Sequence, residues 1–575
     1  MSSRVAPVVT DMIATARAVA KDFLQSVVLV DDQAAFGSEG AASFGKGATS
    51  DMAALDGPEA ADPEAFTTSR ARRRLPRLQS PVLASPVPLP EQALDAKELV
   101  DGFADQGLVC AVIRPGISES PVERTVCAAR RADIVILDWE LNRDGGESTL
   151  QIVRRLVHEE AEAEPRGRLR LVAVYSGTPQ LRKISARLLK ELSGEKSASP
   201  FRRDGDFAIA AGAVRIVVFG KPTTRLEKTD KLLRARVIAG RDLPGCLIDE
   251  FAKMTTGLVP HVTLASLSAL RKNMHRVLGR LRADLDSAYL WHRATQVRPA
   301  DAETHLVDLV VDELRAVLED EGVGKWANLD AIAQWIAHGK RNDFGASFGE
   351  KGTRSAEEVL RLLTKGAAGK EDDNKDVRDK FPKMCAEKGA HREVGIAGFA
   401  ETAEMARNAN ESLAALMSLK TRYERPHPRL ELGTVLMRGH GKSRTYWLCV
   451  QPRCDSVRLK GCTAFPLLPL YLVNDGKKFD VLLPEGRRGY RRFRLAKKPA
   501  EIEMPAFPVH PADGDSVVAE IYGKGFAFVA RGGRRYAWVA DLKPEHAQRI
   551  AQQVANEFSR VGLTESEWLR LWSTK

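Results

Sequence analysis

Paired cysteines and long hydrophobic runs are both scarce in this chain of 575 residues. The seven cysteines show no paired spacing, which argues against a disulfide scaffold and indicates a reducing compartment. No stretch approaches the ~18 uninterrupted apolar residues of a membrane span. Asp11 and Lys21 interrupt the apolar stretches near the N-terminus, so we expect no signal peptide. These absences together predict a cytoplasmic location and no membrane partner.

Motifs of independent enzymes are also missing. The chain has no Gly-x-Ser-x-Gly elbow, no Cys/His nucleophile signature and no complete P-loop, and no winged-helix, kinase, cyclase or nuclease pattern stands out. A zinc site is disfavoured because the cysteines nearest to histidines are separated by four and seven residues, whereas zinc knuckles use two to four: Cys449, Cys454 and Cys462, with His427 and His440. We therefore expect no enzymatic activity outside the site described below.

Positive charge is unevenly distributed. The formal net charge is +11, yet residues 421–500 hold 18 Lys and Arg against 6 Asp and Glu, so the remainder sums to about −1. Cations interleaved with aromatics suit a polyanion, because phosphates take the charge and bases stack on rings. We predict binding of nucleic acid or an acidic protein by Arg487, Arg488, Tyr490, Arg491, Arg492, Phe493, Arg494, Lys497 and Lys498. A solvated surface is the alternative, for this run and for the basic cluster Ser69–Arg77.

Hydrophobic periodicity divides the N-terminal part into alternating helices and strands. A helix is expected over residues 1–23, and a Gly/Ala/Ser/Pro-rich insertion over 34–90. Short, wholly apolar runs predict five buried strands: Ser26–Val30, Leu108–Ile113, Asp133–Leu137, Leu169–Tyr175 and Val214–Phe219. Because helical stretches separate these strands, residues 24–225 should form an α/β domain with a parallel sheet covered on both faces.

The rest of the chain predicts a different architecture. Residues 226–425 carry apolar residues at three- and four-residue spacing and should be all-α. Residues 426–542 contain short strand-like segments separated by Gly, Pro and Asp, including VRLKG at 457–461, and predict a small basic β-rich barrel or sandwich. Two C-terminal helices are expected over 543–575. At ~150 residues per domain, such a multidomain layout suits the length.

Polar side chains follow four of the predicted strands in the α/β region. Asp31 and Asp32 end the first strand, Asp138 ends the third, and Ser176 and Lys221 follow the last two. Carboxyl ends of parallel strands meet in one crevice, so these side chains should converge. Clustered carboxylates are costly to bury unless a cation is shared, and their oxygens suit Mg²⁺.

The chemistry that follows from this cluster is phosphoryl transfer. Asp138 could attack a phosphoryl group as a carboxylate nucleophile. Mg²⁺ and Lys221 would neutralise the phosphoryl oxygens, and Ser176 could donate a hydrogen bond to the resulting acyl phosphate.

This ordered set of residues resembles the receiver domain of two-component response regulators. The resemblance covers about residues 24–225 and rests on Asp31-Asp32, Asp138-Trp139, Gly145-Gly146, Ser176-Gly177 and Lys221-Pro222. It implies a flavodoxin-like fold in which Asp138 is the phospho-acceptor. It further implies that Asp31 or Asp32, Asp138 and the main-chain carbonyl of Glu140 hold Mg²⁺, and that the donor is a histidine kinase or a small acyl phosphate.

The sequence departs from ordinary receivers in three places. The 34–90 insertion is far longer than the usual loop after the first strand. Leu141-Asn142 stands where a Met-Pro-like pair is common, and Val218, followed by Phe219, occupies the place of the switching aromatic. The Tyr/Phe–Ser/Thr coupling is therefore expected to be altered.

Two functions are favoured by these features, and a third, a catalytic site within residues 421–545, would need an unrecognised motif. The first is a bacterial two-component-type response regulator, phosphorylated at Asp138, whose receiver controls the basic C-terminal module. The alternative is a receiver fold that is not phosphorylated and serves as a scaffold in a multiprotein complex, for example one linked to defence or stress.

Overall fold

The structure is a computed structural model that divides into two compact units, Met1–Ala327 and Asn328–Lys575. The described residues are 11–36, 94–116, 121–162, 169–193, 201–222, 231–339, 344, 348, 352–367, 375–382, 398–423, 427–474, 479–485, 489–496, 498–509 and 515–558. The 34–90 insertion, the Ser69–Arg77 cluster and the second C-terminal helix thus lie largely or wholly outside them. The division between the units falls inside the stretch expected to be one helical domain.

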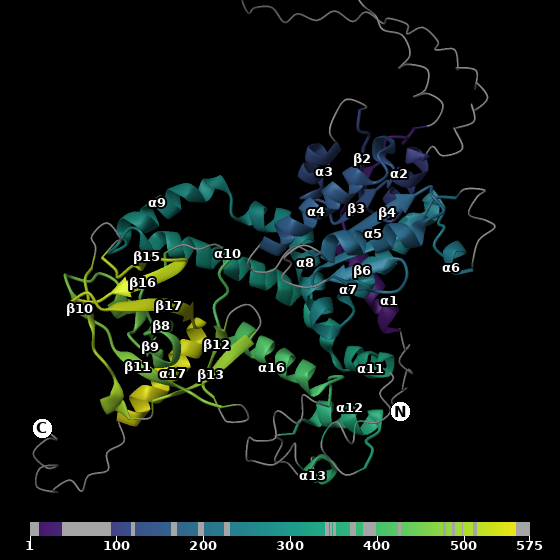
Figure 1. The fold of residues 1–575 in the computed structure, drawn as a ribbon. Coiled ribbons are helices and arrows are strands. Elements are labelled where there is room, and N and C mark those ends of the chain that lie inside the picture. The colour runs from purple at the N-terminus through teal and green to yellow at the C-terminus, as the bar shows by residue number, and fades with distance from the viewer. Residues whose placement is uncertain are drawn as a thin grey trace, which may run out of the picture. The chain divides into compact units, whose positions relative to one another are not determined.

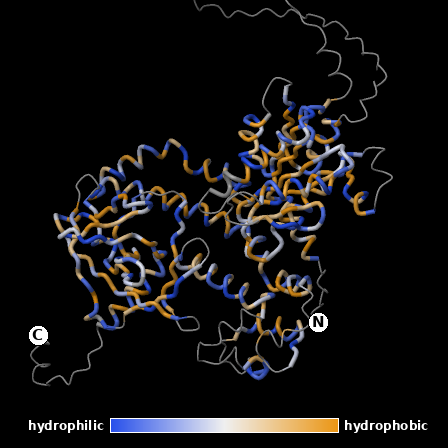
Figure 2. Tube along the Cα trace, in the orientation of Figure 1, coloured by the Kyte–Doolittle hydropathy of each residue, from blue (hydrophilic) through white to orange (hydrophobic). Residues whose placement is uncertain are grey.

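A parallel sheet forms the centre of the first unit (Figure 1). Its strands pair in the order β2-β1-β3-β4-β7, which is the flavodoxin-like order expected from the resemblance. Each strand coincides with a predicted apolar run to within one residue at either end: β1 Ser26–Val30, β2 Val109–Ile113, β3 Ile134–Leu137, β4 Arg170–Ser176 and β7 Val214–Gly220. The central strands are apolar along their length (Figure 2), because both of their faces are covered.

Helices cover the two faces of this sheet. One face packs against α3 (Pro121–Ala129), α4 (Glu147–Glu162) and α5 (Leu181–Ser193). The other packs against α1 (Met12–Phe23), α2 (Ala96–Asp105) and α7 (Leu243–Thr255). Asp11 and Asp95 cap α1 and α2 by accepting a hydrogen bond from a main-chain N–H of the first turn. The α/β prediction is confirmed.

A short antiparallel extension of the sheet was not predicted. Strands β5 (Arg202–Arg203) and β6 (Ala208–Ala211) form a hairpin, and β6 pairs with the last parallel strand, β7. A strand of two arginines and a strand of mostly alanine carry neither the β-branched enrichment nor the alternation that marks a strand in sequence.

A buried ion cluster ties α7 to the sheet. Glu250 of α7 is 3 % exposed, and its carboxylate accepts hydrogen bonds from Arg215 of β7 at 2.9 Å, Arg236 at 3.1 Å and Lys253 at 2.8 Å. Burial alone would raise the pKa of Glu250. The hydrogen bonds and positive charges of Lys253 and Arg215 outweigh it and lower the pKa below the ordinary value.

We expect Glu250→Gln to destabilise the first unit by about 2–3 kcal/mol at pH 7, because the buried Arg215 loses one of its two carboxylate partners and keeps only Asp204. A lowered folded-state pKa means that the ionised carboxylate contributes stability above its unfolded pKa, and that this contribution disappears as pH falls through the folded value. Denaturant unfolding at pH 7 and at acid pH measures the difference. The exposed Glu123→Gln should cost far less. An equal loss for the two variants would contradict the prediction.

Beyond the receiver-like sheet, the first unit continues in helices. A single helical turn, α6, precedes α7, and long helices follow it. Their bounds are α6 Lys231–Arg234, α8 Leu258–Arg280, α9 Asp286–Thr295 and α10 Asp301–Asp320, with short 3-10 turns η2 Gly240–Asp242, η3 Ala283–Leu285 and η4 Val323–Ala327.

The second unit begins with helices around a small aromatic core. The helices are α11 Leu329–His338, α12 Ala356–Lys365, α13 Lys375–Lys380 and α16 Ala403–Ser418. Asn328 and Thr402 cap α11 and α16, and Ser355 forms a capping box with Glu358 at the start of α12. Phe344, Phe348 and Phe381 are buried together with apolar residues of α11, α12 and α13, and α16 contributes none of the described residues of this cluster. The middle of the chain is therefore helical, as predicted.

A single open sheet of eight antiparallel strands follows, in the order β12-β13-β11-β9-β8-β17-β16-β15. The strands are β8 Thr434–Arg438, β9 Thr445–Cys449, β11 Leu467–Leu472, β12 Val481–Glu485, β13 Gly489–Leu495, β15 Glu520–Tyr522, β16 Gly525–Val529 and β17 Arg535–Asp541. A separate two-stranded sheet joins β10 Thr463–Ala464 to β14 Ala506–Phe507. Helix α17, Pro544–Phe558, ends the described chain.

This sheet has the form of half a barrel, where the sequence predicts a small barrel or sandwich. Its two faces bury separate apolar clusters, one under α17 and one around Trp447, Phe528 and Tyr536. Alternation of apolar and polar residues indicates that the two faces of a strand differ. It does not indicate whether the first and last strands of the sheet pair and close it into a barrel. VRLKG was also assigned wrongly: it is irregular, Arg458 has φ +60°, and the strand lies later, at Leu467–Leu472.

Among the described residues, the helices include none with the length and apolar character needed to cross a membrane.

Candidate functional site

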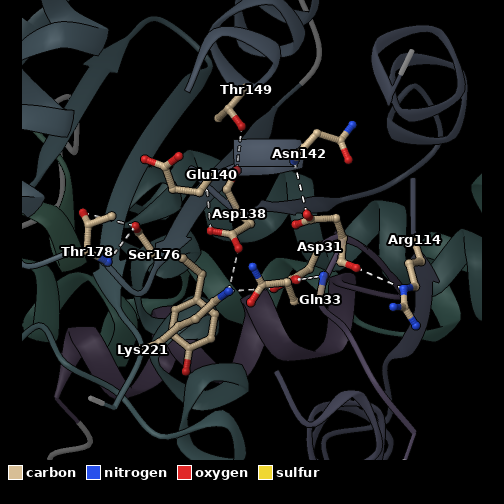
Figure 3. A network of polar contacts seen from close by, with 12 residues as sticks. Asp31, Gln33, Arg114, Asp138, Glu140, Asn142, Thr149, Ser176, Thr178 and Lys221 are labelled. Atoms are coloured by element: carbon tan, nitrogen blue, oxygen red, sulfur yellow. Dashed lines mark hydrogen bonds and ion pairs between the residues drawn. The ribbon is translucent and has the colours of Figure 1, made fainter. Parts of the chain in front are cut away.

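The predicted polar residues converge at the carboxyl edge of the parallel sheet (Figure 3). Asp31 and Asp138 immediately follow β1 and β3, Ser176 is the last residue of β4, and Lys221 follows β7. Asp32 lies beside them, although up to 190 residues separate members of the group. The topology brings them together because adjacent parallel strands end at the same edge.

Lys221 joins two of the carboxylates. Its Nζ atom lies 2.7 Å from Oδ2 of Asp31 and 2.8 Å from Oδ2 of Asp138. Burial would lower the pKa of Lys221, but the charges of Asp138 and Asp31 together outweigh burial and raise it. The lysine is therefore a fixed cation within a buried acidic cluster.

Asp138 is held in place from three directions. Besides the ion pair with Lys221, its Oδ1 accepts a hydrogen bond from the main-chain N–H of Glu140 at 3.4 Å, and its main-chain carbonyl accepts one from the Thr149 hydroxyl at 2.6 Å. The residue is 5 % exposed. Burial and the neighbouring Asp31 raise the pKa of Asp138 in spite of Lys221. An oriented and poorly solvated carboxylate suits a nucleophile.

The three aspartates form a site that fits a divalent cation. Each of Asp31, Asp32 and Asp138 offers one carboxylate oxygen, and these oxygens all lie within 4.8 Å of one another. Oδ2 of Asp32 accepts a hydrogen bond from the Asn142 N–H at 3.2 Å, whereas the buried Oδ1 has no hydrogen-bond partner. A buried oxygen without a donor is costly, and a hard cation such as Mg²⁺ would satisfy it.

The loop after β3 has an unusual backbone that follows from its sequence. Asn142 and Arg143 adopt φ of +55° and +57°, and Gly146 has φ of +93°. A Cβ at Gly146 would lie 2.3 Å from the Trp139 ring, so only glycine fits there. The main-chain carbonyl of Glu140 accepts a hydrogen bond from Arg143 at 3.1 Å, and its role as a metal ligand stays a prediction.

Ser176 lies on the opposite side of Asp138 from Asn142 (Figure 3). It is fully buried, and its hydroxyl accepts a hydrogen bond from the main-chain N–H of Thr178 at 3.2 Å. Its main-chain carbonyl accepts a hydrogen bond from Lys221 N at 2.8 Å, which joins the ends of two strands. Sequence reasoning missed Thr149, Asn142 and Thr178, because their contacts depend on loop geometry rather than on strand ends.

A second unpredicted feature links the site to the segment after β7. The Tyr175 ring lies 5.8 Å from Nζ of Lys221, and its hydroxyl donates a hydrogen bond to the carbonyl of Ile238 at 2.7 Å. Ile238 also donates its N–H to the carbonyl of Gly220 at 3.0 Å. The lysine loop is thus connected to the chain entering α7.

Comparison with family models gives a match to the response receiver domain over residues 23–226, about a third of the chain. Residues 23–226 form a receiver domain. No curated protein and no solved structure matches the chain. The receiver domain indicates response-regulator-type signalling and implies a phosphodonor such as a histidine kinase. Receiver domains typically bind Mg²⁺, in agreement with the acidic cluster of this receiver.

The basic run predicted to bind a polyanion lies in and around β13, in the second unit. Part of this run is buried. Phe493 is 1 % exposed and packs 4.7 Å from Tyr446, and Arg492 is 3 % exposed and pairs with Glu411 of α16. These two residues are therefore not part of an exposed surface, because the sheet is covered on both faces here. Arg491 pairs with Glu485. Tyr490 and Arg494 are half-buried, Lys498 is exposed, and Arg487, Arg488 and Lys497 lie outside the described residues.

Four further cations are exposed along the β15–β17 edge of the same sheet. Lys524 occupies the turn before β16. Arg531 and Arg534 occupy the turn after it, at the other end of that strand, and Arg535 is the first residue of β17. Arg535 lies over the exposed ring of Tyr522, 5.5 Å from its centre. This combination of free cations and an aromatic ring is what the sequence argument attributed to residues 487–498.

The disfavoured zinc site is not assembled. Cys449 is buried, and burial raises its pKa to about 12, whereas Cys454 and Cys462 are exposed. In the part of the chain that the structure describes, the aspartate cluster is the one group of metal-ligating side chains brought together.

Proposed function

We propose that this protein is a response regulator whose receiver accepts a phosphoryl group on Asp138 from a histidine kinase or a small acyl phosphate. The observation that carries the proposal is the buried cluster in which Lys221 holds Asp31 and Asp138 beside the unpartnered oxygen of Asp32. Unlike a purely structural ion pair, this cluster keeps one carboxylate oxygen unsatisfied.

The residues present divide the chemistry between them. A carboxylate oxygen of Asp138 attacks the phosphorus atom, so an O–P bond forms while the bond to the donor's nitrogen or oxygen breaks and the donor keeps the electron pair. Lys221 stabilises the charge on the transferred group, and Ser176 offers its hydroxyl to the product. Asp31, Asp32, Asp138 and the Glu140 carbonyl would hold Mg²⁺, which supplies further positive charge to the phosphoryl oxygens.

Beryllofluoride, which mimics a bound phosphoryl group, tests this proposal. Trp139 follows Asp138 directly and is 5 % exposed, so its fluorescence should report occupancy. We expect a saturable change that requires both Mg²⁺ and beryllofluoride and disappears in Trp139→Phe, together with a rise in the unfolding temperature that Trp139→Phe retains. If neither signal responds in the wild-type protein, the receiver is not phosphorylated and the scaffold alternative is favoured.

The output proposed for the protein is binding of nucleic acid by the second unit. Its support is the set of exposed cations on the β15–β17 edge, which pair with no acidic side chain among the described residues. Phosphates would neutralise these cations, and Tyr522 would stack on a base. Lys498, and the predicted basic residues outside the described parts, extend this positive charge along the sequence.

Salt-dependent binding of a labelled single-stranded oligonucleotide checks this output. Replacing Lys524, Arg531, Arg534 and Arg535 by Ala should make the negative slope of log K against log salt shallower by about 3, at about 0.7 per phosphate contact. The matched control replaces four exposed cations of the first unit: Lys97, Lys183, Lys190 and Arg241. If the affinity does not change with salt concentration, or if the two variants change the salt dependence equally, nucleic acid does not bind through this edge. An acidic protein would then be the proposed partner.

A further inference from the structure

Helices α8, α9 and α10 form an arm of the first unit that extends beyond the receiver (Figure 1). The first half of α8 is anchored by buried His261, Leu264 and Ser268. Arg280 of α8 pairs with Glu313 of α10 at 2.9 Å, and Asn273 with Glu321, at the end of α10, at 3.0 Å. The earlier residue of α8, Asn273, contacts the later residue of the partner helix, and Arg280 contacts the earlier one. Helices α8 and α10 therefore run antiparallel.

This arm has almost no core of its own. None of the side chains of α9 is buried, and Ala302 alone is buried in α10. Large apolar side chains are instead exposed, with Leu278 at 68 % and Trp291 at 71 %. The others on these three helices are Val259, Leu267, Met274, Leu290, Leu306, Val307, Leu309 and Val311. Helices in water gain most of their stability from packing an apolar face, so this face requires a cover.

The spacing of the exposed residues suits a helix–helix seam. Leu267, Met274 and Leu278 are separated by seven and four residues along α8, and Val307 and Val311 by four along α10. Leu314 and Leu318, both half-buried, continue the α10 stripe with the same spacing. Such three- and four-residue steps place apolar side chains along one line, as in helical bundles.

Charge on the two helices is segregated by sign. Helix α8 carries four cations, Arg271, Lys272, Arg276 and Arg280, and no acidic residue. Helix α10 carries seven acidic residues and only Arg315 as a cation. Arg276 of α8 and Asp308 and Asp312 of α10 are exposed and form no ion pair in the described chain.

We propose that a second copy of this chain covers the arm, with α8 of each copy packed against α10 of the other. A cover must present acidic charge to α8 and basic charge to α10 at the same time, and a two-fold related copy does this. Pairing of α10 with α10, or of α8 with α8, would oppose like charges and is disfavoured. The result is a four-helix assembly that buries the exposed stripes. This inference does not depend on phosphorylation of Asp138.

Sedimentation of the full chain tests the dimer. The wild-type protein should have twice the mass of one chain at micromolar concentration. Replacing Leu278 or Val307 by Asp should raise the dissociation constant of the dimer at least about 30-fold. Ile521→Asp, at an equally exposed position on β15, should leave it unchanged. A monomeric wild-type protein, or a dimer that tolerates the arm variants, would overturn the proposal and leave another partner for this face.

Charge reversal tests which helices meet. Arg276→Glu on α8, and Asp308→Arg with Asp312→Arg on α10, should each weaken the dimer by like-charge repulsion. Mixing the two variant proteins should restore it, because both α8–α10 contacts of the mixed dimer again join opposite charges. If mixing restores nothing while each variant is weakened alone, the cross-pairing is wrong. Since folding of each variant is checked by circular dichroism, loss of structure is distinguished from loss of pairing.

Discussion

Asp138→Asn is expected to abolish phosphorylation. With Mg²⁺ and labelled acetyl phosphate, the wild-type chain should acquire about one hydroxylamine-labile phosphoryl group, and the variant should stay at background. The amide that replaces the carboxylate has the same shape but no nucleophilic oxygen. Lys221 keeps its ion pair with Asp31, so the edge of the sheet should retain its geometry. The measurement is radiolabel incorporation, with the site located by mass spectrometry.

The stability of this variant supplies the control. Burial raises the folded-state pKa of Asp138, so the ionised side chain costs stability above that pKa, and the cost is absent below the unfolded value. Asp138→Asn should therefore match or exceed the wild-type unfolding temperature at neutral pH, with any gain shrinking in acid. Undiminished labelling of the variant would assign the phospho-acceptor elsewhere. Full signalling by the variant in cells would instead support the scaffold alternative.

The parts of the fold that the sequence predicts well are those in which one physical requirement controls every residue. Strands such as Ile134–Leu137 are buried on both faces, so all their positions are apolar and their ends are sharp. The aspartates and the lysine of the site follow from these strands directly, since strand ends fix where they lie. The half-barrel was harder to predict, because alternation along a strand does not reveal whether the sheet closes.

Other elements depend on partners that are distant in sequence. Arg492 looks like any surface cation, but Glu411, 81 residues earlier, pairs with it and allows its burial. Tyr175 reads as one more apolar residue of a buried strand, yet its hydroxyl reaches Ile238 and its ring lies beside Lys221. The Val218-Phe219 pair suggested that the usual aromatic switch is altered. Both residues are buried, and Tyr175 is the aromatic that contacts the lysine.

The same principle explains why the arm helices were expected simply as part of an all-α domain. Their three- and four-residue spacing predicts helices with an apolar face, and this is confirmed for α8 and α10. Spacing does not specify what covers that face. Charge indicates what covers the face, because α8 has a positive and α10 a negative net charge. This difference restricts the ways in which two copies can pack.

Removal of Lys221 should have the largest effect on stability at the site. Lys221→Met leaves Asp31 and Asp138 buried without their shared cation, and breaking a buried pair costs about 3–5 kcal/mol. Mg²⁺ should restore part of this loss, so the variant should gain more in unfolding temperature from Mg²⁺ than the wild type does. The loss should also shrink in acid, where the carboxylates become protonated.

The control Lys97→Met removes an exposed ion pair and should leave the free energy of unfolding almost unchanged. Equal losses in the two variants, or a Lys221→Met variant indifferent to Mg²⁺, would show that the aspartates do not form a cation site that Lys221 partly neutralises.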